Sequence, residues 1–425
     1  MSSSGRTIIT GIEFGTDKIC VIHGMPDQNG NIEVLSFASR PSKNSVVKGV
    51  IVDQNAALAI LRETLEESEK GLGRVFNRSE RLVYFLVNGM HVSFRFGEGT
   101  VLIYDSDKKV TREHVAQAID NAKNLAVSTD LDNIQVYDSS FLLDGRKRTF
   151  NPVGQLAEKL TAIVHIVFAE KKRLETVKVI LRELGFEDGY PVFAPFADAY
   201  SVLTADEQSQ GTLLIDYGAG VCAYVLLYQE GVLFSGVLPT GVNNVANDLS
   251  VALDLPYDFC HKFIRESKLE TLRAEGKSCI EYMVSSGGSD KIRRIPLDSF
   301  EKVMDLRQRE TFSLIKNELE RAKALPCINS VVLTGGGAMI ESASDILKNV
   351  MGLPVRVGEA MNVTGALSSF RSPMPCYSAI LGLVKHAAAL EADSPSGGNG
   401  LRRAMENAGD QIMKQLFNLG KALKV

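Results

Sequence analysis

The chain has 425 residues, 45% of them hydrophobic and 23% charged. This balance is typical of a folded globular protein and excludes a disordered or collagen-like chain. A chain of this length exceeds the size at which one hydrophobic core stops growing, so we expect two or more domains. The net charge of −4 argues against a nucleic-acid-binding protein.

The cysteines and the apolar runs narrow the class further. The six cysteines are widely spaced and do not pair with histidine at metal-ligand spacing, so we expect neither a disulfide framework nor a zinc site. No apolar run is long enough for a signal peptide or a membrane span, and the cytosol is the expected compartment.

Apolar strand patterns alternate with helical patterns along the chain, which predicts an α/β fold. The pattern predicts strands at 7–14, 18–23, 81–88, 211–216, 221–228, 232–238 and 330–333, and helices at 53–70, 111–125, 171–184, 297–325 and 341–350.

One sequence pattern occurs twice, about two hundred residues apart. ITGIEFGTDKICVIHG begins at Ile9 and TLLIDYGAGVCAYVLLY begins at Thr212, and each contains a strand, an acid, one residue, a glycine, a short turn and a second strand. Glycine after a strand lets backbone N–H groups approach phosphate oxygens, and the acid can hold a hydrated Mg²⁺. Two such hairpins that face each other would hold a polyphosphate from both sides.

A third glycine cluster follows the predicted strand SVVLT, and it consists of Gly335, Gly336 and Gly337. Taken alone, three glycines between a strand and a helix are most often a tight turn. Beside two phosphate-binding hairpins, the exposed backbone of this cluster would suit the flat ring of an adenosine.

These motifs, in this order, resemble the actin/Hsp70/sugar-kinase ATPase superfamily. Within it the chain is most similar to the FtsA family of actin-like bacterial cell-division proteins. The residues that carry the narrower resemblance include GIEFGTDKICVIHG (11–24), VNGMHVSF (87–94), LLIDYGAGV (213–221), VVLTGGGAMIES (331–342) and PCYSAILGLV (375–384).

The resemblance implies an actin-like fold of two lobes, each built on a ribonuclease-H-like sheet, with an FtsA-type small insertion in lobe 1 and a C-terminal amphipathic helix. The implied segments are the lobe 1 core at 1–84 and 166–209, its insertion at 85–165, the lobe 2 core at 210–246 and 310–364, its insertion at 247–309, a return to lobe 1 at 365–390, a flexible linker at 391–400 and the terminal helix at 401–425.

The resemblance also implies an ATP site with Mg²⁺ between the lobes. Its expected nucleotide-binding residues are Glu13, Gly15, Thr16, Lys18, Asp216, Gly218, Gly220, Gly241, Gly335, Gly336 and Gly337. Glu13 and Asp216 are the candidates to hold Mg²⁺ through water, and Asp216 is also the candidate catalytic residue. Ala194 or Pro195 falls about where actin carries a water-positioning glutamine, so at most slow ATP hydrolysis is expected.

The last residues form a separate unit. EADSPSGGNG, from Glu391 to Gly400, has the composition of a flexible linker. In the following 25 residues an apolar stripe lies opposite basic residues at helical spacing, which suits the surface of an anionic membrane. The expected membrane-binding residues are Met405, Ile412, Leu416, Phe417, Leu419, Leu423, Lys414 and Lys421. A helix that docks on its own protein body or on another chain is the alternative.

The FtsA resemblance implies a protein that polymerises on the cytoplasmic face of the inner membrane at the division site. There it would anchor FtsZ through the FtsZ C-terminal tail and recruit other division proteins. Arg293 and Arg294, in the lobe 2 insertion, are candidates to contact that tail. The alternatives are a PilM-like pilus-assembly scaffold and a small-molecule kinase of the same superfamily, although the sequence offers no motif for the aspartate that such a kinase needs.

Overall fold

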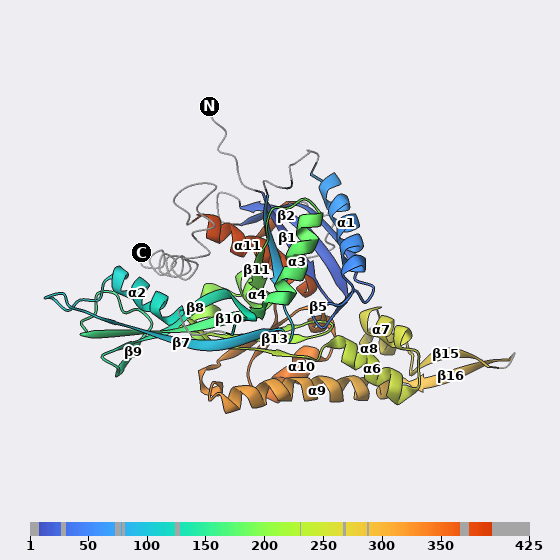
Figure 1. The fold of residues 1–425 in the computed structure, drawn as a ribbon. Helices are drawn as coiled ribbons and strands as arrows, with labels where there is room; N and C mark the ends of the chain where they lie inside the picture. Colours follow the sequence, from blue (N-terminus) through green and yellow to red (C-terminus); the bar gives the residue numbers. More distant parts are fainter. Residues whose placement is uncertain are drawn as a thin grey trace.

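The computed structural model describes residues 8–26, 31–72, 78, 81–123, 128–229, 231–266, 269–286, 289–365 and 374–392. The chain folds into two lobes, drawn one above the other in Figure 1, and smaller units extend from opposite ends of the molecule.

Lobe 1 is built on a six-stranded sheet with the order β11-β6-β1-β2-β3-β19. Strands β1 (Ile9–Phe14), β2 (Lys18–Pro26) and β3 (Ile32–Pro41) form an antiparallel meander. Strands β6 (Leu82–Val87) and β11 (Tyr190–Phe193) follow β1 in parallel, and β19 (Val363–Gly365) pairs with β3. A small antiparallel pair, β4 (Val46–Val47) and β5 (Val50–Ile51), follows the meander.

Lobe 2 repeats the same plan with the order β14-β13-β12-β17-β18. Strands β12 (Thr212–Tyr217), β13 (Cys222–Tyr228) and β14 (Gly231–Leu238) form the meander, and β17 (Ser330–Thr334) and β18 (Val355–Val357) add in parallel. The two halves of the chain are therefore a structural duplication, as the repeated hairpin pattern predicted.

Helices cover both faces of the lobe 1 sheet, which explains its nearly continuous apolar strands. His23 on β2 pairs through Nε2 with Ser68 Oγ, 3.1 Å away on α1 (Gln54–Lys70). Its neighbour Gly24 lies against Val384 of α11 (Ser378–Ala392), so α1 and α11 cover opposite faces. Helix α3 (Lys171–Glu183) packs on α1.

In lobe 2, alternate residues of β12 enter different cores. Leu213 and Ile215 pack with α6 (Val242–Leu253), α9 (Leu297–Arg321) and α10 (Ala343–Met351), whereas Leu214 joins the lobe 1 core. The hydrophobic core is thus continuous across the two lobes on that face of the sheet.

The lobe 1 insertion is a four-stranded antiparallel sheet with the order β7-β10-β8-β9. Its strands are β7 (Val92–Leu102), β8 (Leu131–Leu143), β9 (Lys147–Thr149) and β10 (Lys159–Glu170), and α2 (Arg112–Lys123) packs on β7 and β10. The boundaries that we placed at 85 and 165 fall inside β6 and β10, because β6 pairs with β1 in the lobe 1 sheet and the separate sheet runs from Val92 to Glu170.

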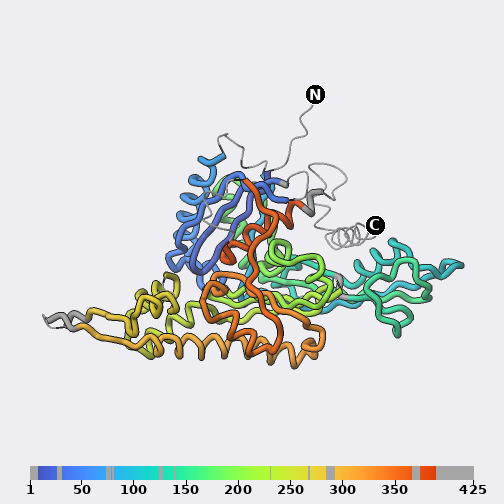
Figure 2. Tube along the Cα trace, turned by 180° about the vertical axis from the view of Figure 1, so that it is seen from behind, coloured from blue at the N-terminus to red at the C-terminus, as the bar shows by residue number. Residues whose placement is uncertain are grey.

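The lobe 2 insertion contains two short helices and a hairpin. Helices α7 (Tyr257–Glu266) and α8 (Leu269–Ala274) precede the hairpin of β15 (Cys279–Ser286) and β16 (Ser289–Pro296), which projects away from the body in both views (Figures 1 and 2). Helices α6 and α9 run through the boundaries that we placed at 247 and 309.

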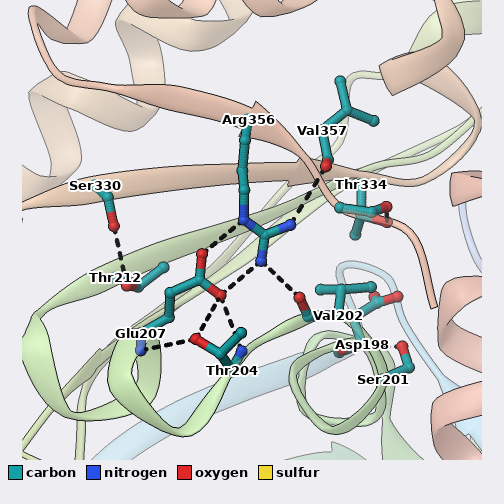
Figure 3. A network of polar contacts seen from close by, with 11 residues as sticks. Asp198, Ser201, Val202, Thr204, Glu207, Thr212, Ser330, Thr334, Arg356 and Val357 are labelled. Carbon is teal, nitrogen blue, oxygen red and sulfur yellow. Dashed lines mark hydrogen bonds and ion pairs between the residues drawn. The ribbon is translucent and has the colours of Figure 1, made fainter. Parts of the chain in front are cut away.

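The chain crosses between the lobes twice. The first crossing runs through α4 (Ala194–Val202) and α5 (Ala205–Gln210), and the second runs from β18 to α11. Arg356 of β18 ties them together: its guanidinium donates to both carboxylate oxygens of Glu207 at 2.6 Å and to the carbonyl oxygen of Val202 at 2.7 Å (Figure 3). The two connections therefore form one hydrogen-bonded hinge region.

Helices α4 and α11 also touch directly, because Gly382 leaves no side chain between them.

Within the described residues, no helix is both long and apolar enough to cross a membrane. Of the linker predicted at 391–400, Glu391 and Ala392 belong to α11. Its remaining residues, 393–400, and the predicted terminal helix at 401–425, with every membrane-binding residue named above, lie outside the described residues.

Candidate functional site

A cleft of about 580 Å³ lies between the lobes. The turns of both repeated hairpins and the third glycine cluster line it, although they are far apart in the sequence. The predicted site residues that line the cleft are Glu13, Gly15, Thr16, Lys18, Asp216, Gly218, Gly220, Gly335 and Gly336.

In the lobe 1 hairpin, the turn between β1 and β2 is closed by the Gly15 N–H, which donates to the carbonyl oxygen of Lys18 at 2.9 Å. Lys18 Nζ lies 3.8 Å from Glu13 Oε1 and donates to the carbonyl oxygen of Cys376 at 2.8 Å. Burial by itself would lower the pKa of Lys18, but the negative charge of Glu13, together with smaller contributions from Cys20, Cys376 and Tyr377, raises the pKa overall. Lys18 is therefore a fixed cation in the cleft.

Glu13 Oε2 is buried and has no hydrogen-bond partner within the part of the chain that the structure describes. A buried carboxylate oxygen without a partner is costly, because desolvation is then not compensated. This atom, at the end of β1 in the cleft, is suited to accept a hydrogen bond from a ligand or from a metal-bound water.

The lobe 2 hairpin has the same turn, because the Gly218 N–H donates to the carbonyl oxygen of Val221 at 3.0 Å. A Cβ on Gly220 would lie 2.5 Å from Thr16 Oγ1, so the two turns are in direct contact across the cleft. Only two glycine-containing turns can approach so closely, which is a physical reason for glycine at 220.

Asp216 is the last residue but one of β12 and is only 9% exposed. Its Oδ2 accepts a hydrogen bond from Asn88 Nδ2 at 3.2 Å, which links the two lobes. Burial, followed by the negative charge of Glu13, raises the pKa of Asp216 to about 7. The two acids of the repeated motif therefore face the same cleft and repel each other when both are charged.

The glycine cluster lies against Asp216. Gly335 has φ +83, and a Cβ there would lie 2.3 Å from Asp216 Oδ1. Gly337 does not line the cleft and instead packs on the ring of Tyr217, 2.3 Å from where its Cβ would be. Gly241 does not line it either: its missing Cβ would meet the carbonyl oxygens of Gly218 and Ala219 at 2.5 Å, so it supports the hairpin turn from behind.

Apolar and charged side chains together line the part of the cleft that the lobe 2 helices form, with Arg273 and Glu301 among the charged ones. Ile264, Leu269, Met304 and Ile340 line it, from α7, α8, α9 and the segment after the glycine cluster. The cleft therefore offers glycine-containing turns on one side and both apolar and charged side chains on the other to a ligand.

Ala194 lines the cleft at the start of α4, so this position offers no polar side chain. Asp198, one turn later, is fully buried, and neither carboxylate oxygen has a hydrogen-bond partner within the described residues. Burial, and then the charge of Asp216, raises the pKa of Asp198 well above its usual range.

Sequence reasoning missed several cleft residues. Asn88 stands at a strand end in the motif VNGMHVSF, so its position after a strand was an available signal. Met304 could not be found that way, because only the packing of α9 in the lobe 2 core brings it to the cleft.

The two arginines predicted to bind a partner lie on β16 and already have acidic partners. Arg293 Nη1 donates to the backbone oxygen of Asp254 at 2.8 Å and lies 3.2 Å from its Oδ2. Arg294 Nε donates to Glu281 Oε1 at 2.9 Å. A partner segment that binds these arginines must compete with these carboxylates.

Among the described residues, no group of three or more His, Cys, Asp and Glu side chains is arranged to hold a metal ion. Glu13 and Asp216 alone fit a Mg²⁺ that is held through water and completed by phosphate oxygens, since Mg²⁺ commonly keeps several waters.

Two family models match the chain. The SHS2 domain inserted in FTSA matches residues 89–168, and Cell division protein FtsA matches residues 213–382. The first match covers the separate four-stranded sheet, and the second covers most of lobe 2 and its return to lobe 1.

Curated relatives match over most of their length. Cell division protein FtsA of Borreliella burgdorferi is 26% identical over 89% of this chain and 90% of the relative. The FtsA of Pseudomonas aeruginosa is 26% identical over 92% of each chain, and that of Escherichia coli is 24% identical over 91% of each.

Solved structures confirm the actin-like α/β fold. A PilM-PilN type IV pilus biogenesis complex has a TM-score of 0.60 at 17% identity and covers 90% of this chain and 99% of its own. MreB 5 of Spiroplasma citri bound to AMPPNP has a TM-score of 0.55 at 12% identity and covers 96% and 100%. At these identities the likeness shows the fold alone.

Proposed function

Because this chain belongs to the FtsA family of actin-like cell-division proteins, we propose that it is an ATP-binding protein that polymerises on the cytoplasmic face of the inner membrane. There it anchors FtsZ filaments and recruits other division proteins. The observation that supports ATP binding most directly is the meeting of both duplicated hairpins and the glycine cluster in one cleft. The MreB 5 neighbours were solved with AMPPNP and with ADP, which supports the same proposal.

In this proposal the two turns hold the phosphates, with Gly15 and Thr16 on one side and Gly218 and Gly220 on the other. Lys18 neutralises phosphate charge, since Glu13 and the Cys376 carbonyl oxygen fix its position. Glu13 and Asp216 hold Mg²⁺ through water, and the ion would neutralise charge on the phosphates. A pKa of about 7 means that, near neutral pH and without ligand, the Asp216 carboxyl is partly protonated. A cation bound beside it would favour the ionised carboxylate.

We propose that hydrolysis is slow at most. Ala194 cannot orient a water, and Asp198 is buried beneath the cleft surface. ATP would then act mainly by favouring one arrangement of the two lobes, and the lobe arrangement would set the tendency to polymerise.

Equilibrium binding of MgATP to the full chain tests the site, with phosphate release followed on the same samples. Asp216→Ala should weaken binding at least about tenfold, because it removes a carboxylate from the phosphate end of the cleft. Asp206→Ala is the control, since Asp206 is exposed on α5 outside the cleft. Equal affinity in all three proteins would reject this site.

The membrane proposal depends on the sequence of the terminal segment. Truncation after Ala392 leaves α11 complete and should release the protein from vesicles that contain anionic lipid, with MgATP affinity unchanged. Ile412→Asp together with Leu416→Asp in the full chain should have the same effect by interrupting the apolar stripe. A truncated protein that still sediments with vesicles would contradict the proposal.

We propose that the lobe 2 insertion binds the FtsZ C-terminal tail, with Arg293 and Arg294 as contributors. Because Asp254 and Glu281 already neutralise these side chains, their contribution should be small. Charge reversal at both positions should weaken binding of an FtsZ tail peptide in a titration, and the same reversal at Lys172 on α3 in lobe 1 should not. Unchanged peptide affinity in the arginine variant would remove the two residues from the interface.

A further inference from the structure

A charged cluster at the mouth of the cleft lies beside the proposed phosphate site, and none of its residues was assigned to that site. Asp17 stands in the turn of the lobe 1 hairpin, and His261 and Arg265 stand one turn apart on α7 of lobe 2. Arg265 Nη1 lies 3.2 Å from Asp17 Oδ1, and His261 Nε2 lies 3.6 Å from the same oxygen. All three side chains line the cleft.

Each side of this contact is fixed to its own lobe. The Ser42 N–H donates to the carbonyl oxygen of Asp17 at 3.0 Å, which holds the turn on lobe 1. Helix α7 is held on lobe 2 through buried Phe263, whose ring centroid is 4.4 Å from that of Phe300. The Asp17 ion pair therefore joins the two lobes.

Exposure shows which end of the cleft this contact closes. Arg265 has a side chain that is 56% exposed, whereas Ala194 and Ser378, at the starts of the two crossing helices, are 4% and 1% exposed. The hinge region thus forms the buried floor of the cleft, and the ion pair lies at its open edge.

We propose that Asp17, His261 and Arg265 form an interlobe gate that holds the cleft closed and limits the rate at which nucleotide leaves it. The gate has a second effect, because Asp17 follows Thr16 at the phosphate end of the cleft. The Arg265 guanidinium on α7 neutralises a carboxylate that would otherwise repel a polyphosphate. This proposal rests on the proposed nucleotide binding.

The expected effect is modest, since the arginine is largely exposed. Pairs of this kind change an equilibrium by about two- to fivefold, and salt screens them. Loss of the pair should therefore speed nucleotide release by about two- to fivefold at low salt, and the difference should shrink as salt is added.

The test is a double-mutant cycle on the full chain, with Asp17→Arg, Arg265→Asp and both together. Release of a fluorescent ATP analogue is followed after addition of excess MgATP. Arg265→Asp should accelerate release. In the double variant the two opposite charges are present again in exchanged positions, so release should be accelerated by less than the product of the two single-variant accelerations. Lys262→Asp is the matched control, because Lys262 lies on the same helix and pairs only with Glu266 of its own helix at 3.7 Å in the described contacts. Unaltered release in Arg265→Asp, or independent single effects, would overturn the gate.

A measurement without nucleotide separates failure of the gate from failure of the proposed ATP site. Amide hydrogen exchange of the nucleotide-free protein should increase in the β1–β2 turn and in α7 in Arg265→Asp, but not in Lys262→Asp. If no variant binds the analogue, increased exchange still supports an interlobe contact. Unchanged exchange would refute it.

Discussion

The close crossing of α4 and α11 makes Gly382 the residue most sensitive to a single added methyl group. A Cβ at 382 would lie 1.8 Å from the carbonyl oxygen of Ala197, and real Cβ contacts are not shorter than 3.0 Å. Gly382→Ala must therefore move the two helices apart by at least 1.2 Å, which is 3.0 minus 1.8. The obstacle is backbone, so no side-chain rotation can relieve it.

The separation has an energetic cost because α11 is packed on both sides. Ile380, Leu383 and Val384 are fully buried, and movement of α11 disturbs all three contacts. Overpacking of this kind costs about 1–3 kcal/mol or more, whereas alanine gains only about 1 kcal/mol over glycine in helix propensity. We expect a net loss of up to about 2 kcal/mol. Because the entropy of unfolding scales with chain length, this loss should lower the apparent Tm of the 425-residue chain by roughly 2 °C.

Thermal unfolding of the full chain measures this directly, and Gly336→Ala is the matched control. The same methyl group at 336 would lie 3.9 Å from Cys376 Cβ, which is ordinary contact. The control should keep the Tm of the parent protein within about 0.5 °C. A Gly382→Ala protein as stable as its parent would show that α4 and α11 do not cross as closely as described.

Three further predictions concern the hinge, a buried histidine and the cleft. Arg356→Met removes the two hydrogen bonds to Glu207 and should lower the free energy of unfolding by about 1 kcal/mol. The loss is small because the Arg356 side chain is 40% exposed. Chemical denaturation measures this loss, and an unchanged denaturation midpoint would show that the Arg356 network does not stabilise the fold. His165→Phe should reduce the acid sensitivity of the protein. Burial lowers the pKa of His165 to about 3, so the unfolded chain binds a proton below pH 6.5 that the folded chain does not, and stability falls by about 2 kcal/mol between pH 8 and pH 5. Denaturation at both pH values should show that the variant loses about 2 kcal/mol less stability than the parent between pH 8 and pH 5. An identical loss in both proteins would show that His165 does not cause the acid sensitivity. Gly335→Ala forces a methyl group toward Asp216 Oδ1 at φ +83 and should lower MgATP affinity at least about tenfold in a binding titration, whereas retained affinity would place the ligand elsewhere.

Local sequence patterns determined the elements and the chemistry of the phosphate end of the cleft. The acid and glycines of each hairpin are close in sequence to the turn that they shape, so Glu13, Gly15, Asp216 and Gly218 could be named before their arrangement was known. Gly337 was predicted as a ligand because it belongs to the glycine cluster, and Gly241 because of the family resemblance. The structure places both behind the cleft surface, where Gly337 packs on Tyr217 and Gly241 packs on backbone.

Tertiary structure alone decided which distant segments meet. Asp17 and Arg265 are separated by 248 residues, and Asn88 and Asp216 by 128, so no local periodicity could pair them. The buried state of Asp198 and the contact of Gly382 with Ala197 also depend on how two helices from different halves of the chain cross. Sequence periodicity records which face of an element is apolar, whereas the partner of that face is fixed only when the whole core packs.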